Sequence, residues 1–140
     1  MSQDPTLDIP LEAGVARTGN VLPLLHEIRH VLQCWLDSGT PAMIDLRSIP
    51  MAPGEDEELT RRLGEGEVQA RLSALGPSDI QETRYPGVWL VTHYNEDREI
   101  MGRFIEVTDM PAILKSQAVD VRAGLENLQH DLAELDLRKL

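Results

Sequence analysis

The chain has 140 residues, a formal net charge of −11, and 41% hydrophobic and 26% charged residues. These values are typical of one soluble globular domain large enough to bury a core, and they exclude a disordered chain. The acidic excess argues against nucleic acid and anionic membranes as partners, because affinity for phosphates comes from clustered cations.

Cysteine usage and the N-terminal segment favour a cytoplasmic protein. Cys34 is the single cysteine, so neither an internal disulfide nor a thiolate zinc site is expected. We expect no secretory signal and no membrane insertion, because no apolar run approaches the ~20 residues that cross a bilayer. Residues 1–19 contain two prolines and two glycines with little apolar periodicity, which predicts a flexible lead-in.

Residues 20–140 predict a single domain with helices at both ends. Apolar spacing predicts a helix over 20–37, and an acidic first turn predicts a short helix over 55–63. Alternating apolar residues predict the strands, which we place at 42–47, 67–74, 79–84, 88–94 and 99–107. The short turns between the last four strands imply an antiparallel meander, whereas the long connection over 48–65 leaves a parallel crossover, and so a mixed sheet, open.

A long C-terminal helix is expected after Thr108 and Asp109, with Pro111 in its first turn, and it should run to about Asp136. Its apolar residues alternate spacings of four and three, the period of a helix packed along another helix; they are Leu114, Ala118, Val121, Leu125, Leu128, Leu132 and Leu135. We expect this seam to pack within its own chain, and pairing with a second copy is the alternative. The predicted fold class is α+β: a mainly antiparallel or mixed sheet of four to five strands, with an N-terminal helix, a short acidic helix and the long C-terminal helix packed on it.

Residues 26–30 read His-Glu-Ile-Arg-His, the H-E-x-x-H pattern of zinc peptidases. On a helical wheel both histidines point away from the apolar side, where a third ligand and a cleft would have to lie. We therefore expect exposed helix residues, no metal, no cofactor and no catalytic residues. A small zinc-dependent hydrolase using His26, Glu27 and His30 is the alternative, and a purely structural homodimer is another.

Three segments have an unusual arrangement of glycine, proline and charged residues among their apolar residues. They are Ile-Asp-Leu-Arg-Ser-Ile-Pro at 44–50, Leu-Gly-Glu-Gly-Glu-Val at 63–68, and Ile-Gln-Glu-Thr-Arg-Tyr-Pro-Gly-Val-Trp at 80–89. Together they resemble the HupH/HyaF-type hydrogenase expression and formation proteins, over about residues 42–120. The start of the C-terminal helix at Pro111 also resembles that family. Family members are commonly longer, with a related second region.

The resemblance implies a cytoplasmic accessory protein, or chaperone, in the maturation of an uptake [NiFe]-hydrogenase. It implies two partners: the precursor of the iron–sulfur small subunit before export, and a thioredoxin-like hydrogenase accessory protein. Such a protein acts by binding, so the resemblance implies no enzyme.

The predicted partner-binding residues lie in the last two segments: Glu65, Gly66, Glu67, Glu82, Thr83, Arg84, Pro86 and Gly87. Alternation places Glu67 on the solvent side if Val68 faces the core, whereas Glu82 shares its side with Ile80 and needs a sheet margin or a partner. The alternative is structural, with glycines that permit tight turns and a tryptophan that fills the core. We expect the acidic face to hold a basic stretch of an unfinished hydrogenase subunit.

Overall fold

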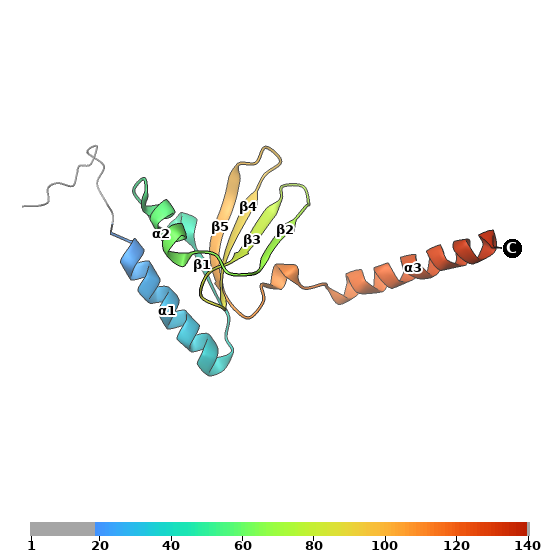
Figure 1. Ribbon diagram of the computed structural model, residues 1–140, viewed down its shortest axis with the longest axis horizontal. Coiled ribbons are helices and arrows are strands. Elements are labelled where there is room, and N and C mark those ends of the chain that lie inside the picture. Colours follow the sequence, from blue (N-terminus) through green and yellow to red (C-terminus); the bar gives the residue numbers. More distant parts are fainter. Residues whose placement is uncertain (1–18, 140) are drawn as a thin grey trace, which may run out of the picture. The chain divides into compact units, whose positions relative to one another are not determined.

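The computed structural model describes residues 19–139 (Figure 1). The chain divides into two compact units, Met1–Asp109 and Met110–Leu140, and each is described by itself. The single domain expected over 20–140 therefore stays a prediction. The flexible lead-in expected over 1–19 lies, except for Gly19, outside the described residues.

Helix α1 (Val21–Ser38) confirms the first predicted helix. It ends at Gly39, which adopts a left-handed φ of 75° and donates its N–H to the carbonyl of Trp35 at 2.7 Å. Asn20, where the predicted helix begins, directly precedes α1, and its side chain does not cap the helix. The Asn20 amide instead donates to the carbonyl of Pro50 at 2.6 Å and ties the start of α1 to the loop before the next helix.

Helix α2 (Glu55–Leu63) has the predicted bounds. Its acidic first turn contains one residue with an internal role, because Glu55 is 2% exposed. The Glu55 carboxylate accepts hydrogen bonds from the backbone N–H groups of Ala52 and Gly19, each at 3.0 Å. This carboxylate therefore fixes the loop that leads into α2 and the segment that leads into α1.

Five strands form one sheet in the order β1-β5-β4-β3-β2, and every pairing among them is antiparallel. The strands are β1 (Ala42–Asp45), β2 (Gln69–Leu72), β3 (Ser78–Glu82), β4 (Val88–Tyr94) and β5 (Ile100–Val107). The predicted meander β2-β3-β4-β5 is confirmed, and the open alternative of a mixed sheet is wrong. The segment after β1, a 3₁₀ turn η3 (Leu46–Ser48) and then α2, leads from one edge of the sheet to the other.

Strand β2 is shorter than predicted because it lies at an edge and pairs with β3 alone. Ala70 and Leu72 are half-buried, as the alternation indicates. Val68, expected on the same face, precedes the strand and is 45% exposed, and Ala74 lies beyond it and is also exposed. The apolar pattern thus gives the correct face but overestimates the length of the strand.

The core of the first unit lies between one face of the sheet and the helices α1 and α2, which lie together on that face (Figure 1). Its buried side chains come from both helices and the central strands: Leu24, Ile28, Ile44, Leu46, Leu59, Leu63, Val88, Ile105 and Val107. Burial of this apolar surface is the main stabilising contribution, at roughly 25 cal/mol per Å².

The opposite face of the sheet has a second buried cluster. Ile80 and Val91 are fully buried, and Trp89 is 4% exposed. The Trp89 indole N–H donates to the carbonyl of Thr108 at 3.0 Å, which satisfies the one polar group of a buried side chain. The prediction that Trp89 fills the core is confirmed.

The second unit contains a 3₁₀ turn, η4 (Ala112–Leu114), and helix α3 (Ala118–Arg138). The long helix therefore begins at Ala118, well after the predicted first turn at Pro111, because Lys115 and Gln117 adopt extended conformations (ψ 133° and 145°) that interrupt it. None of the described residues of α3 is buried. Within its own unit nothing covers the predicted seam, so its packing on the sheet stays a prediction. Among the described residues, no helix combines the length and the apolar character that crossing a membrane requires.

Glu106 offers a test of the packing on this second face of the sheet. It lies opposite Met43 of β1 and Trp89 of β4 in the strand register. Burial raises the pKa of the Glu106 carboxyl, and nearby His93 lowers it in part. With a folded-state pKa above the unfolded value, the stabilising contribution is complete below the unfolded pKa and is lost as the pH rises through the folded pKa. We expect Glu106→Gln to raise the melting temperature near neutral pH by about 1–4 °C. In acid the two proteins should melt alike, and a lower Tm for the variant near neutral pH would contradict this account.

Candidate functional site

The two segments that carry most of the predicted binding residues, 63–68 and 82–88, lie side by side in the fold. Three backbone hydrogen bonds join them. Gly66 N–H donates to the carbonyl of Glu82 at 2.7 Å, Glu82 N–H to that of Val68 at 2.9 Å, and Arg84 N–H to that of Leu63 at 2.8 Å. The two sequence motifs are therefore one structural unit, which we call the motif pair.

The side chain of Glu82 adds a fourth connection. Its Oε1 atom accepts hydrogen bonds from the backbone N–H groups of Glu67 at 2.9 Å and Val68 at 3.1 Å. These two N–H groups precede β2 and lie outside its ladder with β3, so the carboxylate supplies their acceptor. The partner that the strand alternation demands for Glu82 is thus the backbone of the same chain.

Two glycines permit this close approach. A Cβ atom on Gly66 would lie 2.5 Å from both Glu82 Oε1 and the carbonyl oxygen of Thr83. Gly64 has a φ of 66°, and a Cβ there would lie 2.7 Å from Nε of Arg84. The Gly66 position excludes any side chain because one of the blocking atoms belongs to the backbone.

Thr83 shapes the turn between β3 and β4. It is 1% exposed, and its hydroxyl donates to the carbonyl of Val88 at 2.9 Å and accepts from the N–H of Tyr85 at 3.2 Å. The turn closes where Val88 N–H donates to the carbonyl of Tyr85 at 3.0 Å, with Gly87 at a φ of 93°. Thr83 and Gly87 therefore hold the backbone in place rather than facing solvent.

The predicted binding residues separate into two groups. Gly66, Glu82, Thr83 and Gly87 organise the motif pair from within. The exposed group comprises Glu65, Glu67, Arg84 and Pro86. Contact between a partner and this exposed group stays a prediction.

A pocket of about 300 Å³ lies beside the motif pair, between α1 and the β3–β4 turn. Its lining is mainly apolar and consists of Leu25, Ile28, Arg29, Leu32, Leu63, Tyr85 and Val88. Tyr85, at 46% exposed, stands at the junction of pocket and turn. Sequence reasoning missed the pocket because it assigned the α1 residues to the core, and only the packing of α1 leaves part of that face uncovered.

The histidines of the H-E-x-x-H pattern lie on the exposed face of α1, as the helical wheel predicts. His30 Nε2 lies 3.7 Å from Sγ of Cys34, one turn further along. Within residues 19–139, no three His, Cys, Asp or Glu side chains are placed to hold a metal ion together. The geometry gives the zinc-hydrolase alternative no support.

Sequence reasoning also missed a serine–histidine pair. Ser78 Oγ lies 2.7 Å from Nδ1 of His93, because β3 and β4 place these residues opposite each other. Ser78 is 7% exposed, so its side chain is largely shielded from solvent. The pair satisfies two polar groups across neighbouring strands, and only the strand register could have revealed it.

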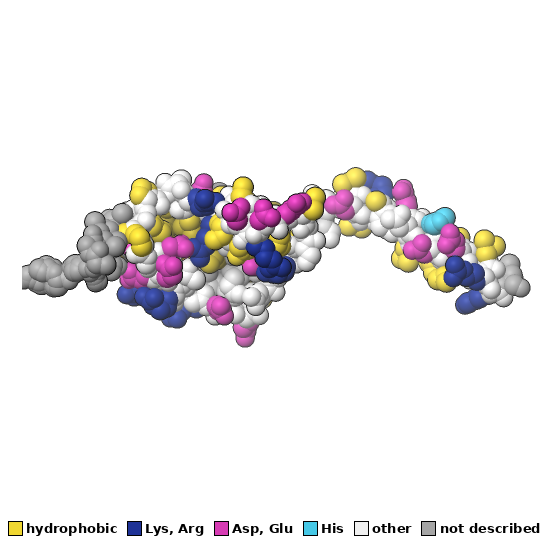
Figure 2. Space-filling view, turned by 90° about the horizontal axis from the view of Figure 1, so that it is seen from above, with side chains coloured by type: hydrophobic (Ala, Val, Ile, Leu, Met, Phe, Trp, Pro, Cys, Tyr) yellow, Lys and Arg dark blue, Asp and Glu magenta, His cyan; other side chains and the backbone are white. Residues whose placement is uncertain are grey.

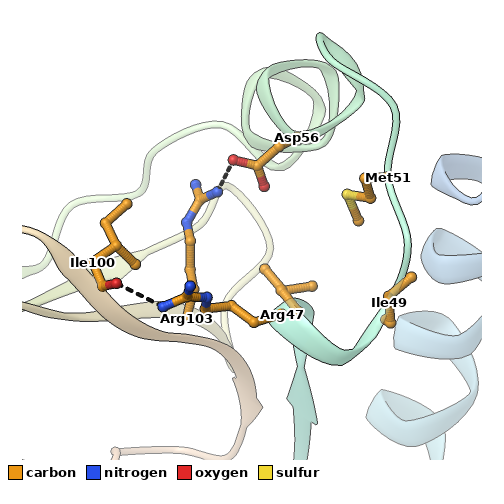
Figure 3. Close-up of a pocket in the computed structure, with 7 residues that line it drawn as sticks. Arg47, Ile49, Met51, Asp56, Ile100 and Arg103 are labelled. Atoms are coloured by element: carbon orange, nitrogen blue, oxygen red, sulfur yellow. Dashed lines mark hydrogen bonds and ion pairs between the residues drawn. The ribbon is translucent and has the colours of Figure 1, made fainter.

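A second pocket, of about 310 Å³, lies between η3, α2 and β5 (Figure 3). Arg47 donates to the carbonyl of Ile100 at 2.6 Å, and Arg103 forms an ion pair with Asp56 and donates to Thr60 Oγ1 at 2.7 Å. Both guanidinium groups thus have partners within the chain. Arg47 belongs to the resembling segment 44–50, and its observed contact joins η3 to β5.

The surface charge of the first unit is mixed. On the face in Figure 2, Asp and Glu side chains stand among Arg and hydrophobic side chains instead of forming a continuous acidic surface. Any attraction of a basic partner therefore depends on local acidic groups such as Glu65 and Glu67 more than on the net charge of −11.

Comparison with known proteins decides the family. Residues 18–135 match the family described as HupH hydrogenase expression protein, C-terminal conserved region. The chain belongs to this family. The predicted resemblance to HupH-type hydrogenase expression proteins is confirmed.

Individual relatives support the same family assignment. The solved structure of the hydrogenase expression protein HupH from Thiobacillus denitrificans ATCC 25259 has a TM-score of 0.81 and 41% identity, over 85% of this chain and 99% of that one. The hydrogenase expression/formation protein HoxQ of Azotobacter vinelandii is 33% identical over 97 residues, 69% of this chain and 34% of that protein. HoxQ of Cupriavidus necator is 27% identical over 109 residues, 78% and 39% of the two chains. The chain thus spans about a third of the length of these HoxQ relatives.

The crowding at Gly66 predicts a large effect of one methyl group. We expect Gly66→Ala to destabilise the first unit by about 1–3 kcal/mol, because the added carbon overlaps a backbone oxygen that cannot move away alone. Gly124→Ala is the matched control, since a Cβ at Gly124 meets nothing within 4 Å. Equal stability of the Gly66→Ala and wild-type proteins in urea titration would show that the two segments are not held this closely.

Proposed function

We propose that this chain is an accessory protein, or chaperone, in the maturation of an uptake [NiFe]-hydrogenase. It binds the precursor of the iron–sulfur small subunit before export. Membership of the HupH family supports the hydrogenase role. The observation that carries the binding role is the motif pair, in which internal hydrogen bonds fix the backbone and leave charged and aromatic side chains exposed.

The exposed part of the motif pair combines two kinds of recognition. Glu65 and Glu67 attract a basic segment, and Tyr85 with the neighbouring pocket receives an apolar one. A precursor segment with basic residues next to apolar ones, such as the region near a twin-arginine leader, fits this combination. Because the backbone of the site is already held in place, little ordering entropy is lost on binding.

The remaining partners follow from the same proposal. The chain works in the cytoplasm beside a thioredoxin-like hydrogenase accessory protein, and it acts by binding, without a cofactor and without catalysis. On the C-terminal helix the sequence predicts a different surface, for a second copy of the chain.

The electrostatic part is tested by reversing two charges. We expect Glu65→Lys with Glu67→Lys to weaken capture of the small-subunit precursor about tenfold at low salt, with a smaller effect as salt screens the charges. Glu82 is left unchanged, because its carboxylate holds the backbone.

The control makes the same change of net charge elsewhere. Glu96 and Asp97 are exposed in the turn between β4 and β5, at the end of β4 away from the motif pair. Glu96→Lys with Asp97→Lys should capture the precursor as the wild type does. Equal capture by all three folded proteins would remove Glu65 and Glu67 from the proposal.

The apolar part is tested at Tyr85. We expect Tyr85→Ala to weaken capture about tenfold with little dependence on salt, because a truncated aromatic loses buried contact rather than charge. Leu75→Ala is the control, since Leu75 is an apolar side chain that is 87% exposed in the β2–β3 turn. Loss of capture in the control alone would place the apolar contact away from the pocket.

A further inference from the structure

Helix α3 exposes a continuous apolar seam. Its five large seam residues are each between 50% and 57% exposed: Val121, Leu125, Leu128, Leu132 and Leu135. A helix of 21 residues gains only marginal stability from its own hydrogen bonds, since helices in proteins depend on packing of an apolar face. The seam therefore requires a partner surface.

The spacing of the seam fits another helix. Residues Ala118, Leu125 and Leu132 occupy the a positions of a heptad, and residues Val121, Leu128 and Leu135 occupy the d positions. Such a narrow stripe matches the groove of a facing helix, whereas a helix that lies on a sheet or a globular core has a wider apolar face.

We propose that α3 pairs with α3 of a second copy of this chain, as an antiparallel two-helix coiled coil. When the seam is aligned on its centre, Leu125 faces Leu128 of the second copy, Leu132 faces Val121, and Leu135 faces Ala118. All six seam positions are then used in each copy, and the interface is self-complementary about a two-fold axis.

The charges beside the seam favour the antiparallel orientation. In a parallel pair, Asp131 at position g would face Asp136 at position e of the second copy, on both sides of the interface. In the antiparallel pair three of the four flanking charges face a neutral residue: Asp131 faces Gly124, Arg138 faces Gln117, and Arg122 faces Gln129. The fourth, Asp136, lies opposite Lys115, which has the opposite charge and precedes α3. Only the parallel arrangement contains like-charge repulsion.

The first experiment measures the mass of the full-length protein in solution. We expect a concentration-dependent dimer by analytical ultracentrifugation. Leu128→Asp should weaken self-association at least about a hundredfold, because it places an unpaired carboxylate at the centre of the seam in both copies. The control is Leu137→Asp, the same substitution at an f position outside the seam, where the side chain is 68% exposed; this variant should dimerise as the wild type does.

The second experiment measures the orientation with spin labels on single cysteines, in a Cys34→Ser background. Labels at Leu137→Cys should be separated by about 30 Å along the helix axis in the antiparallel pair, and should lie side by side in a parallel one. Labels at Asn127→Cys, near the centre, should be close in both orientations, which controls for dimer formation.

Three results would overturn the proposal. The first is a wild-type monomer at all concentrations, including the case in which Leu128→Asp lowers the melting temperature because α3 packs within its own chain. The second is a dimer that Leu128→Asp leaves intact. The third is a short distance between labels at position 137. None of these outcomes bears on precursor capture. The dimer and the proposed function are therefore tested independently of each other.

Discussion

One carboxylate determines how the site is built. Glu82 Oε1 accepts hydrogen bonds from two backbone N–H groups in the segment before β2. The backbone N–H and carbonyl of Glu82 form two further hydrogen bonds with the same segment. Both donors to Oε1 belong to exposed residues, so losing this acceptor costs on the order of 1 kcal/mol, the net contribution of an ordinary hydrogen bond. This contact fixes the backbone of Glu67 and Val68 beside the end of β3. Glu82, which the sequence analysis predicts as a partner-binding residue, is thus a group that holds the motif pair together.

Acidic residues in this chain have two separate roles. Glu55 and Glu82 accept backbone hydrogen bonds and fix loops, whereas Glu65 and Glu67 expose their side chains. The net charge of −11 therefore does not describe one continuous acidic surface. What the structure adds to the charge is an apolar pocket beside the motif pair, which carries the two exposed acids Glu65 and Glu67.

The success of the sequence predictions depended on the range of the interactions. The bounds of α2 could be predicted because an acidic first turn and Gly64 mark its ends locally. The predicted start of α3 was wrong because Pro111 is compatible with the first turn of a helix. No residue nearby in the sequence indicates the extended conformations at Lys115 and Gln117. Ser78 and His93 meet only through strand register. The need of Glu82 for a partner was predictable from Ile80, but the identity of that partner required the approach of a segment 15 residues away.

The sheet order also determines when the fold can be completed. Strands β2 to β5 join neighbours along the chain, but β1 pairs with β5, so Ala42 meets Val107. Contacts of such separation form late, because a long loop must lose its freedom before they stabilise anything. During synthesis, α1 and β1 emerge before the other strands and have no sheet to join until β5 has left the ribosome. The apolar residues of α1 and β1 thus stay uncovered until β5 has been made, and apolar surface exposed in this way favours aggregation.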